Sequence, residues 1–261
     1  MTSTNMRAPS RAILNWLASA ALLAVAPGLA LAGVGLTPSG PTVAENLLRI
    51  ELHLDRPLAA PLDMAHVALF DSTGTPIRDA FLDLPLPDQS GRNVTLLLHP
   101  GRIKRGVGPN LALGPALRSG QSVTLRVDDP QLDRPLEQRW LVTVPLRQRI
   151  DPQQWAVQTV RRGSLQPLRV IVPAALDGAA AAQIAVQDPE GRRMSGSATL
   201  AAGEREWRFT PARIWRPGTY LLRIHPQLED PQGNRLCSAF EQAEQSAQLC
   251  KDEGQVAFVI D

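Results

Sequence analysis

Glu204–Asn234 is the stretch that decides the fold, because the chain carries its pattern twice. The clearer copy reads Glu204-Arg-Glu-Trp-Arg-Phe-Thr-Pro211, Ala-Arg213-Ile-Trp-Arg216-Pro-Gly218, Thr-Tyr-Leu-Leu-Arg-Ile224 and Pro226-Gln-Leu-Glu-Asp230-Pro-Gln-Gly-Asn234. The earlier copy reads Val94-Thr-Leu-Leu-Leu-His-Pro100, Gly-Arg102-Ile-Lys-Arg105, a long excursion to Gly120, Gln-Ser-Val-Thr-Leu-Arg-Val127 and Pro130-Gln-Leu-Asp133. Both copies predict a strand, a proline turn, a glycine, a second strand and an acidic turn.

The N-terminus has the features of a secretory signal peptide. Arg7 and Arg11 precede an apolar stretch from Ala12 to Leu31, and Ala30-Leu-Ala32 is a small-x-small cleavage signal. The apolar core before Pro27 is shorter than the ~20 residues that a membrane-spanning helix needs. We therefore predict cleavage after residue 32, no membrane span in the mature chain, and a periplasmic or secreted protein.

The charge of the mature chain is balanced. The full sequence has 27 basic and 25 acidic side chains, and two of the arginines lie in the predicted signal peptide, which has no acidic residue. A neutral chain has no general attraction for nucleic acid, so we expect no nucleic-acid partner.

Short alternating segments separated by turns run through the rest of the chain. With 23 prolines and 19 glycines, they predict an all-β fold of two tandem sandwiches. The predicted parts are a signal peptide (1–32), an extended lead-in (33–46), a first sandwich (47–146), a linker and lead-in (147–166) and a second sandwich (167–261). Expected strands include residues 47–54, 66–70, 77–84, 94–98, 122–127 and 139–144, then 168–172, 184–188, 193–200, 206–209, 220–225 and 256–260.

The second copy resembles bacterial Ig-like domains of the S-layer-protein type. The motifs that carry the resemblance are Leu176-Asp177, Val186-Gln-Asp188-Pro-Glu-Gly191, Trp207-Arg-Phe209-Thr-Pro211, Gly218-Thr-Tyr220 and Asp230-Pro-Gln-Gly233-Asn234. The first copy keeps Leu62-Asp63, Phe70-Asp-Ser-Thr-Gly74 and Leu98-His-Pro100, but has Gly120-Gln-Ser122 and Asp133-Arg-Pro in place of the last two motifs. The resemblance implies Ig-like extracellular modules that space, adhere or bind, without catalytic residues.

Cys237 and Cys250 are the two cysteines of the chain. Export to an oxidising compartment predicts that they form a disulfide, which would close a helical excursion over residues 238–249. The alternative, a metal site with two cysteines, lacks a nearby histidine.

Catalytic and metal-binding patterns are absent from the sequence. It contains no Gly-x-Ser-x-Gly, phosphate-binding-loop or His-Glu-x-x-His motif, so we expect neither an enzyme nor a bound cofactor. Of the four histidines, His53 and His225 fall in predicted strands, where a partly buried, hydrogen-bonded role is expected. The analogy with periplasmic copper carriers, also small β-sandwiches, fails at their N-terminal histidine, which has no counterpart here.

Two further groups of residues leave alternatives open. The acidic turns at Asp128–Asp133 and Glu229–Asn234 could bind calcium, but turn chemistry is the favoured interpretation. The aromatic residues of the second copy could stack on a glycan. Trp207 and Phe209 are instead expected in the core, with Trp215 more exposed.

The largest difference between the two copies is the excursion of the first, Gly106–Ser119. It follows a basic cluster and is rich in glycine, so it could bind an anion or an acidic patch on a partner. The candidate partner-binding residues are Arg102, Lys104, Arg105 and Asn110. The favoured interpretation of the excursion itself is a surface loop whose leucines pack over the sandwich edge.

The pattern shared by the copies, Pro-x-Arg-Ile-x-Arg, suggests a common role in the turn. These features predict an exported, non-catalytic structural or protein-interaction protein with an unknown protein or cell-envelope partner. The alternative is a periplasmic module that binds a small ligand, a glycan or a metal.

Overall fold

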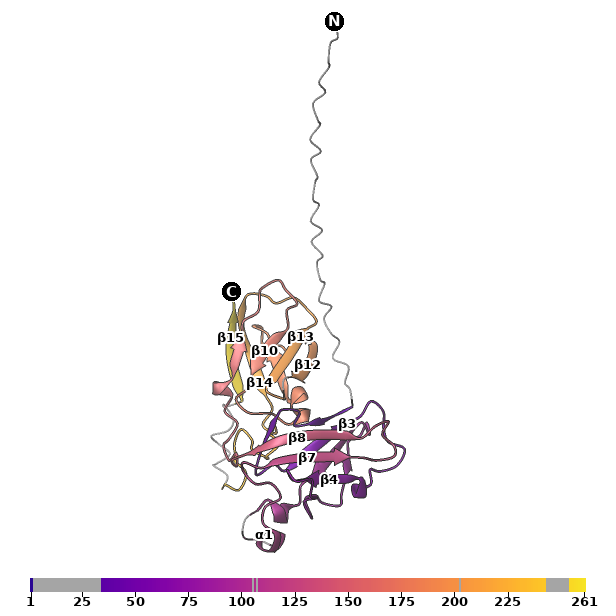
Figure 1. The fold of residues 1–261 in the computed structure, drawn as a ribbon. Coiled ribbons are helices and arrows are strands. Elements are labelled where there is room, and N and C mark those ends of the chain that lie inside the picture. The colour runs from indigo at the N-terminus through magenta and orange to yellow at the C-terminus, as the bar shows by residue number, and fades with distance from the viewer. Residues whose placement is uncertain (2–33, 105, 107, 202, 243–253) are drawn as a thin grey trace. The chain divides into compact units, whose positions relative to one another are not determined.

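The computed structural model describes Met1 and residues 34–104, 106, 108–201, 203–242 and 254–261 (Figure 1). Apart from Met1, the predicted signal peptide lies outside the described residues, as do Arg105 and Cys250. The chain from Ala32 to Asp261 forms one compact unit. We call residues 34–146 the first half of this unit and residues 147–261 the second half.

The first half contains two four-stranded sheets, with strand orders β1-β3-β6-β5 and β2-β8-β7-β4. Their strands are β1 (Gly35–Thr37), β2 (Thr42–Ala44), β3 (Arg49–His53), β4 (Val67–Phe70), β5 (Leu86–Pro87), β6 (Asn93–Leu97), β7 (Ser122–Val127) and β8 (Leu136–Thr143). Short helices interrupt them at η1 (Met64–His66), η2 (Pro100–Arg102) and α1 (Gly108–Leu113).

The second half contains a four-stranded sheet, β12-β13-β10-β9, and a three-stranded sheet, β11-β14-β15. Its strands are β9 (Ala156–Gln158), β10 (Leu168–Ile171), β11 (Ile184–Gln187), β12 (Gly196–Ala201), β13 (Glu206–Pro211), β14 (Gly218–Ile224) and β15 (Gln255–Ile260). The 3-10 helices are η3 (Pro152–Gln154) and η4 (Gly178–Gln183), and Asp177 caps η4 by accepting from the backbone N–H of Ala179.

The two halves repeat one pattern of strand pairing. In the first half β3 pairs with β6, and β7 lies between β4 and β8. In the second half β10 pairs with β13, and β14 lies between β11 and β15 in the same antiparallel sense. The repeat read from the sequence is therefore a repeat of topology, and the predicted all-β fold class is confirmed.

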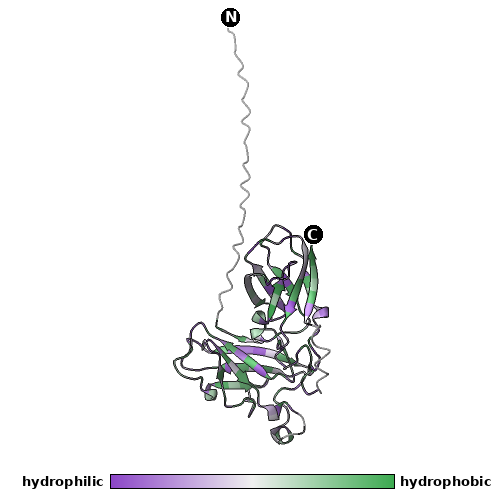
Figure 2. Cartoon of the chain, turned by 180° about the vertical axis from the view of Figure 1, so that it is seen from behind, coloured by the Kyte–Doolittle hydropathy of each residue, from purple (hydrophilic) through white to green (hydrophobic). Residues whose placement is uncertain are grey.

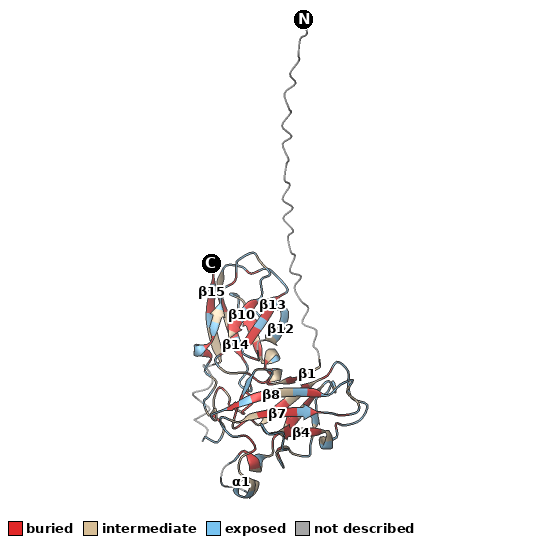
Figure 3. Cartoon of the chain, in the orientation of Figure 1, coloured by how far each residue is buried: buried red, intermediate tan, exposed pale blue. Residues whose placement is uncertain are grey.

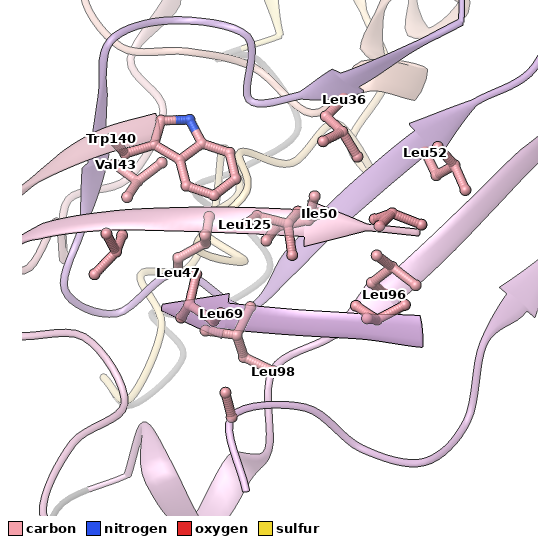
Figure 4. Packing of buried hydrophobic residues seen from close by; sticks show 14 of the residues in the cluster. Leu36, Val43, Leu47, Ile50, Leu52, Leu69, Leu96, Leu98, Leu125 and Trp140 are labelled. Carbon is pink, nitrogen blue, oxygen red and sulfur yellow. The ribbon is translucent and has the colours of Figure 1, made fainter. Parts of the chain in front are cut away.

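Each half buries its own hydrophobic core between its two sheets. The strands alternate between buried and exposed residues, as Figure 3 shows and as the hydropathy colours of Figure 2 reflect. Figure 4 shows the first core, in which Trp140 lies among leucines such as Leu47 and Leu125. The second core is built around Trp207, with 0% of its surface exposed, and Leu222.

The regions predicted as connections contribute to the sheets. Within the lead-in of residues 33–46, β1 pairs with β3, and β2 pairs with β8 in parallel. Within the linker of residues 147–166, β9 pairs with β10, and Trp155 packs in the second core. Short edge strands give little sequence signal because a few residues are too few to show a periodicity.

The strand predicted over residues 77–84 does not form. Phe81 makes an isolated bridge with Leu98, and Asp79 has a positive φ of 50°, which interrupts an extended chain. The pairing with β6 is made instead by β5, at Leu86–Pro87, where a break was predicted.

Hydrogen bonds and ion pairs connect the two halves. Asn234 of the second half donates to the carbonyl of Leu146 at 3.1 Å. Within the first half, the side chain of Asn46 donates to the same carbonyl and accepts from the N–H of Leu146, both at 2.8 Å. Ser39 donates from its backbone and its hydroxyl group to the carboxylate of Glu204, at 2.8 and 2.6 Å.

Arg49 is the central charged group of this junction. Its Nε lies 2.6 Å from Oδ2 of Asp177, and its Nη2 pairs with Glu229, which also pairs with Arg235. Both Arg49 and Glu229 keep a low side-chain exposure, 25% and 15%. An ion pair of this kind is stronger than one at the open surface, although desolvation offsets part of the gain.

Candidate functional site

The excursion of the first half, Gly106–Ser119, is preceded by η2, which follows β6. Pro100 occupies the first turn of η2, and the ring Nδ1 of His99 accepts from the N–H of Gly101 at 3.0 Å. A proline at the start of a helix has no N–H to satisfy, so this sequence favours a turn here. The chain then leaves the sheet toward α1 and returns at β7.

Arg102 was predicted to bind a partner, but the structure places it inside the loop. Only 4% of its surface is exposed, and its Nε donates to the carbonyl of Gly114 at 2.7 Å. Its other nitrogens donate to the carbonyls of Arg78 and Pro115. Burial lowers the pKa of Arg102, and the nearby carboxylate of Asp79 opposes that effect. The guanidinium group thus holds the loop together, and its three nitrogens donate to carbonyls of the protein itself and not to a partner.

The other predicted residues of the loop lie in different settings. Lys104 is exposed, and Asn110 is half-buried in α1, where its Nδ2 has no hydrogen-bond partner among the described residues. Arg105 lies outside the described residues. The prediction that this loop carries partner binding stays a prediction.

The leucines of the loop divide between the core and the surface. Leu117 and Ala116 are 2% and 3% exposed and belong to the first core, as does Ile103 at the start of the loop. Leu111, on α1, is 76% exposed. The loop therefore packs over the sandwich edge at its ends and presents an apolar side chain in its middle.

An open pocket of about 400 Å³ lies at the base of the loop. Its wall includes the three arginines Arg78, Arg102 and Arg118. Arg78 lies in the segment predicted as a strand, and Arg118 lies inside the quoted excursion. Neither was selected from the sequence, because only packing brings the two segments together.

The motif shared by the two copies has different roles in the two halves. Arg102 and Ile103 are buried, whereas the corresponding Arg213 and Ile214 are exposed, Ile214 to 54%. The expected common role of the motif in the turn is therefore wrong. The second half has no excursion for an arginine to hold.

Trp215 is buried, contrary to the expectation of exposure. It is 1% exposed, and its Nε1 donates to the carbonyl of Gln166 at 2.8 Å. Trp207 and Phe209 lie in the core as predicted, with ring centroids 5.8 Å apart. None of these rings is free to stack on a glycan.

Tyr220 forms the hydrogen-bonded corner that is common in Ig-like sandwiches. Its hydroxyl group donates to the carbonyl of Arg216 at 3.0 Å and accepts from the N–H of Arg216 at 3.1 Å. The ring packs against Phe258 and Trp215, each with a centroid separation of 5.4 Å. A tyrosine bonded to the backbone a few residues upstream, near the start of a strand, is a mark of this architecture.

The acidic turns are held by their own hydrogen bonds. Oδ1 of Asp230 accepts from the N–H groups of Gln232 and Asn234, and Oδ2 accepts from Nδ2 of Asn234. Asp129 accepts in the same way from Gln131 at 2.8 Å. These are the bonds expected of turn chemistry.

The histidines follow the predictions in part. His53 is half-buried between Thr37 and Asn93, with contacts of 3.0 and 2.8 Å. His225 is exposed beyond the end of β14, so the partial burial predicted for it is wrong. The hydrogen-bonded role predicted for it is confirmed, because its Nδ1 accepts from the N–H of Gln227. Across the described ranges no three His, Cys, Asp or Glu side chains gather as a metal site.

The predicted disulfide cannot be followed through the structure, because Cys250 lies outside the described residues. Cys237 is half-buried and packs against the second core. The pairing stays a prediction, which thiol labelling of the unreduced, denatured protein tests: two labelled cysteines would contradict it. The predicted helix over residues 238–249 also lies mostly outside the described chain, and residues 238–242 form turns.

Glu51 has an unusual pKa for a carboxyl group. Burial, together with the adjacent carboxylate of Asp177, raises the pKa of Glu51 to about 7, against the opposing effect of Arg49. The carboxyl group sits against the start of η4, where a side chain at position 178 would overlap it. The junction of the two halves therefore contains a group that titrates near neutral pH.

Among the described residues, no helix is long and apolar enough to span a membrane. No family model matches the chain, and no curated protein matches it.

Several solved structures are weakly similar to parts of this chain. CopC from Methylosinus trichosporium OB3b is 20% identical over 43% of this chain and 90% of its own, with a TM-score of 0.25. The BSP domain of a biofilm-associated protein is 10% identical over 70% of this chain and 25% of its own, with a TM-score of 0.23. The titin Ig tandem domains A164-A165 are 11% identical over 82% of this chain and 85% of their own, also with a TM-score of 0.23. Similarity at this level assigns neither a family nor an activity.

Proposed function

We propose that the chain is an exported, non-catalytic protein of the cell envelope that binds another protein through the excursion of its first half. Two Ig-like sandwiches, similar in motif to those of S-layer proteins, form the scaffold. The apolar N-terminus with its cleavage signal supports export to the periplasm or beyond. The proposed function requires no cofactor.

The observation that carries the proposal is the way the excursion is held. The guanidinium N–H groups of Arg102 donate hydrogen bonds to the carbonyls of Gly114, Pro115 and Arg78 inside the protein. Burying a charged side chain is unfavourable unless its donors are satisfied, and these three contacts satisfy Arg102 while fixing the loop around it. The arrangement supports a loop with a defined shape.

Leu111 is a large apolar side chain that the described part of this loop exposes. It is 76% exposed on α1, between segments that are anchored in the first core. Binding through a loop that is already ordered loses less conformational entropy than binding through a flexible one. Functional residues often lie on loops that a rigid scaffold positions.

Site-specific crosslinking in the cells of origin tests the proposal. A photo-crosslinking phenylalanine analogue at position 111 should give a covalent adduct larger than the protein alone. The same analogue at position 165 is the matched control, because Leu165 is also exposed, to 54%, but lies in the second half. An adduct from both positions, or from neither, contradicts binding through the excursion.

A thermal-unfolding screen separates this proposal from a small-ligand, glycan or metal-binding module. The mature protein is heated with copper, calcium and a set of envelope glycans. Under the proposal none of them raises the unfolding temperature. A saturable rise with one of them, together with no adduct at position 111, would favour the ligand-binding alternative.

A further inference from the structure

The pocket at the base of the excursion joins segments that are distant in sequence. Its volume is about 400 Å³, and its lining includes Arg78, Arg102, Arg118, Ile77, Leu113 and Pro115. One wall comes from the segment after β4, and the other from the end of the excursion before β7. The lining thus combines cationic groups with an apolar wall.

Two of the three arginines have no internal partner. Arg102 is committed to backbone carbonyls, but the side chains of Arg78 and Arg118 make no hydrogen bond or ion pair with any residue the structure describes, and both are exposed. The guanidinium group of Arg118 lies over Gly114, 3.1 Å from where a Cβ at that position would be. The charges of Arg78 and Arg118 also act on Arg102 and help to lower its pKa.

The nearest carboxylates leave this positive charge incompletely balanced. Asp71, which also lines the pocket, accepts from the N–H groups of Thr73 and Thr75 and from the hydroxyl of Thr73. All three bonds go to Oδ1, so the turn holds this carboxylate in place, and Asp71 forms no ion pair with Arg78 or Arg118 among the described residues. Asp79 acts on Arg102, the arginine that is already buried.

The second half has a pocket beside the equivalent turn, in which one arginine has carboxylate partners. There a pocket of about 250 Å³ next to the β11–β12 turn contains Arg192, which pairs with Asp188 at 3.0 Å and with Glu190 at 2.9 Å. In the first half Thr73 occupies the position that corresponds to Glu190 in the turn. The turn of the second half therefore supplies a carboxylate that the turn of the first half lacks. Arg193, Arg213 and Arg216, which also line the second pocket, make no ion pair with the described residues.

We propose that the pocket of Arg78 and Arg118 binds a carboxylate from an acidic segment of a protein partner, with an apolar neighbour of that carboxylate against Ile77 and Leu113. A guanidinium group matches a carboxylate with two parallel hydrogen bonds. A chain without excess positive charge has no general attraction for polyanions or anionic membranes. The pair Arg78 and Arg118 is therefore expected to bind a single acidic group that reaches the pocket. This inference deepens the proposed function and rests on it.

Peptide binding to the full mature chain tests the inference. The probe is a fluorescein-labelled, end-blocked peptide of alternating glutamate and leucine, with the glutamine–leucine peptide as its uncharged control. Fluorescence anisotropy at low salt should show saturable binding of the acidic probe alone. The double variant Arg78→Gln/Arg118→Gln should weaken that binding at least tenfold.

Two control variants make the result specific. Arg161→Gln/Arg162→Gln removes the same charge from exposed positions outside the pocket and should leave binding unchanged. Equal weakening by this variant would show nonspecific attraction and overturn the inference. Weakening by Arg213→Gln/Arg216→Gln, but not by the variant of the first pocket, would move the site to the second half and overturn it too.

Inorganic phosphate separates a general anion site from one for an acidic segment. At equal charge concentration it should displace the probe much less well than unlabelled acidic peptide does. Equal displacement would overturn the inference. The crosslink at position 111 is independent of these measurements, so a failed peptide test with an intact crosslink rejects the pocket and leaves the proposed function standing.

Discussion

Tyr220 shows how a single hydroxyl group closes a turn of the second half. It bonds to both backbone groups of Arg216, while its ring belongs to the aromatic cluster of the core. The motif Gly218-Thr-Tyr220 therefore has a structural explanation, and the first half, with Ser122 at the corresponding position, has no such corner.

Replacing Tyr220 with phenylalanine should lower the free energy of unfolding by about 1–2 kcal/mol, because the backbone N–H of Arg216 loses its partner while the ring packing remains. Urea unfolding measures this as a lower midpoint with an unchanged slope. Ser122→Ala, at the start of β7, is the matched control and should change little. A Tyr220→Phe variant as stable as the wild type would show that the corner contributes nothing.

Arg102 is a charged residue that was predicted to bind a partner, and its burial gives it a structural role instead. Arg102→Met should lower the free energy of unfolding by about 2 kcal/mol or more, because three backbone carbonyls lose a donor. Arg213→Met, at the exposed counterpart, should have an effect near zero. Equal effects of the two substitutions would show that Arg102 does not hold the loop together.

At the scale of elements, the end of the excursion contributes buried residues to the first core, and its middle extends beyond that core. Ala116 and Leu117 are buried, so replacing Gly106–Ser119 with the short connection of the second half should destabilise the protein by about 3 kcal/mol or more. Removing only Gly106–Leu113 keeps both buried residues and should be much milder. Thermal unfolding of the two deletions compares them, and equal losses would show that Ala116 and Leu117 do not anchor the loop.

At the scale of the whole molecule, the junction of the halves should make stability depend on pH. Burial and Asp177 raise the pKa of Glu51 to about 7 from 4.5, so the folded state holds this proton more tightly than the unfolded state does. The contribution is therefore fully present below pH 4.5 and is lost as the pH rises toward 7, by about 3 kcal/mol. Asp230, whose pKa is raised by burial to about 6, acts in the same direction.

Glu51→Gln removes this titration, so the variant should lose less stability than the wild type between pH 5 and pH 8. Urea unfolding at several pH values measures the difference. Glu137→Gln is the control, because the side chain of Glu137 is 58% exposed and lies away from the junction. Parallel pH profiles for the wild type and Glu51→Gln would show that Glu51 does not titrate in this range.

The sequence by itself determined the local structure of this protein. Alternation at Arg49–His53 and Ser122–Val127, and the turns at Asp71–Gly74 and Asp188–Gly191, depend on neighbouring residues alone, so these strands and the repeat could be predicted. The cores followed from the same alternation, since a period of two places every second side chain on one face of a sheet.

Only the tertiary structure decided which polar and aromatic residues outside the strands are buried. Trp215 lies in a loop and Arg102 in the short helix η2, where no periodicity can be read, and their polar groups find partners in Gln166 and in Gly114. Arg78 and Arg118 are 40 residues apart in the chain and line one pocket. Arg49 meets Asp177 and Glu229 across the junction, and such long-range pairs arise from how the two sandwiches pack, which no local pattern of residues encodes.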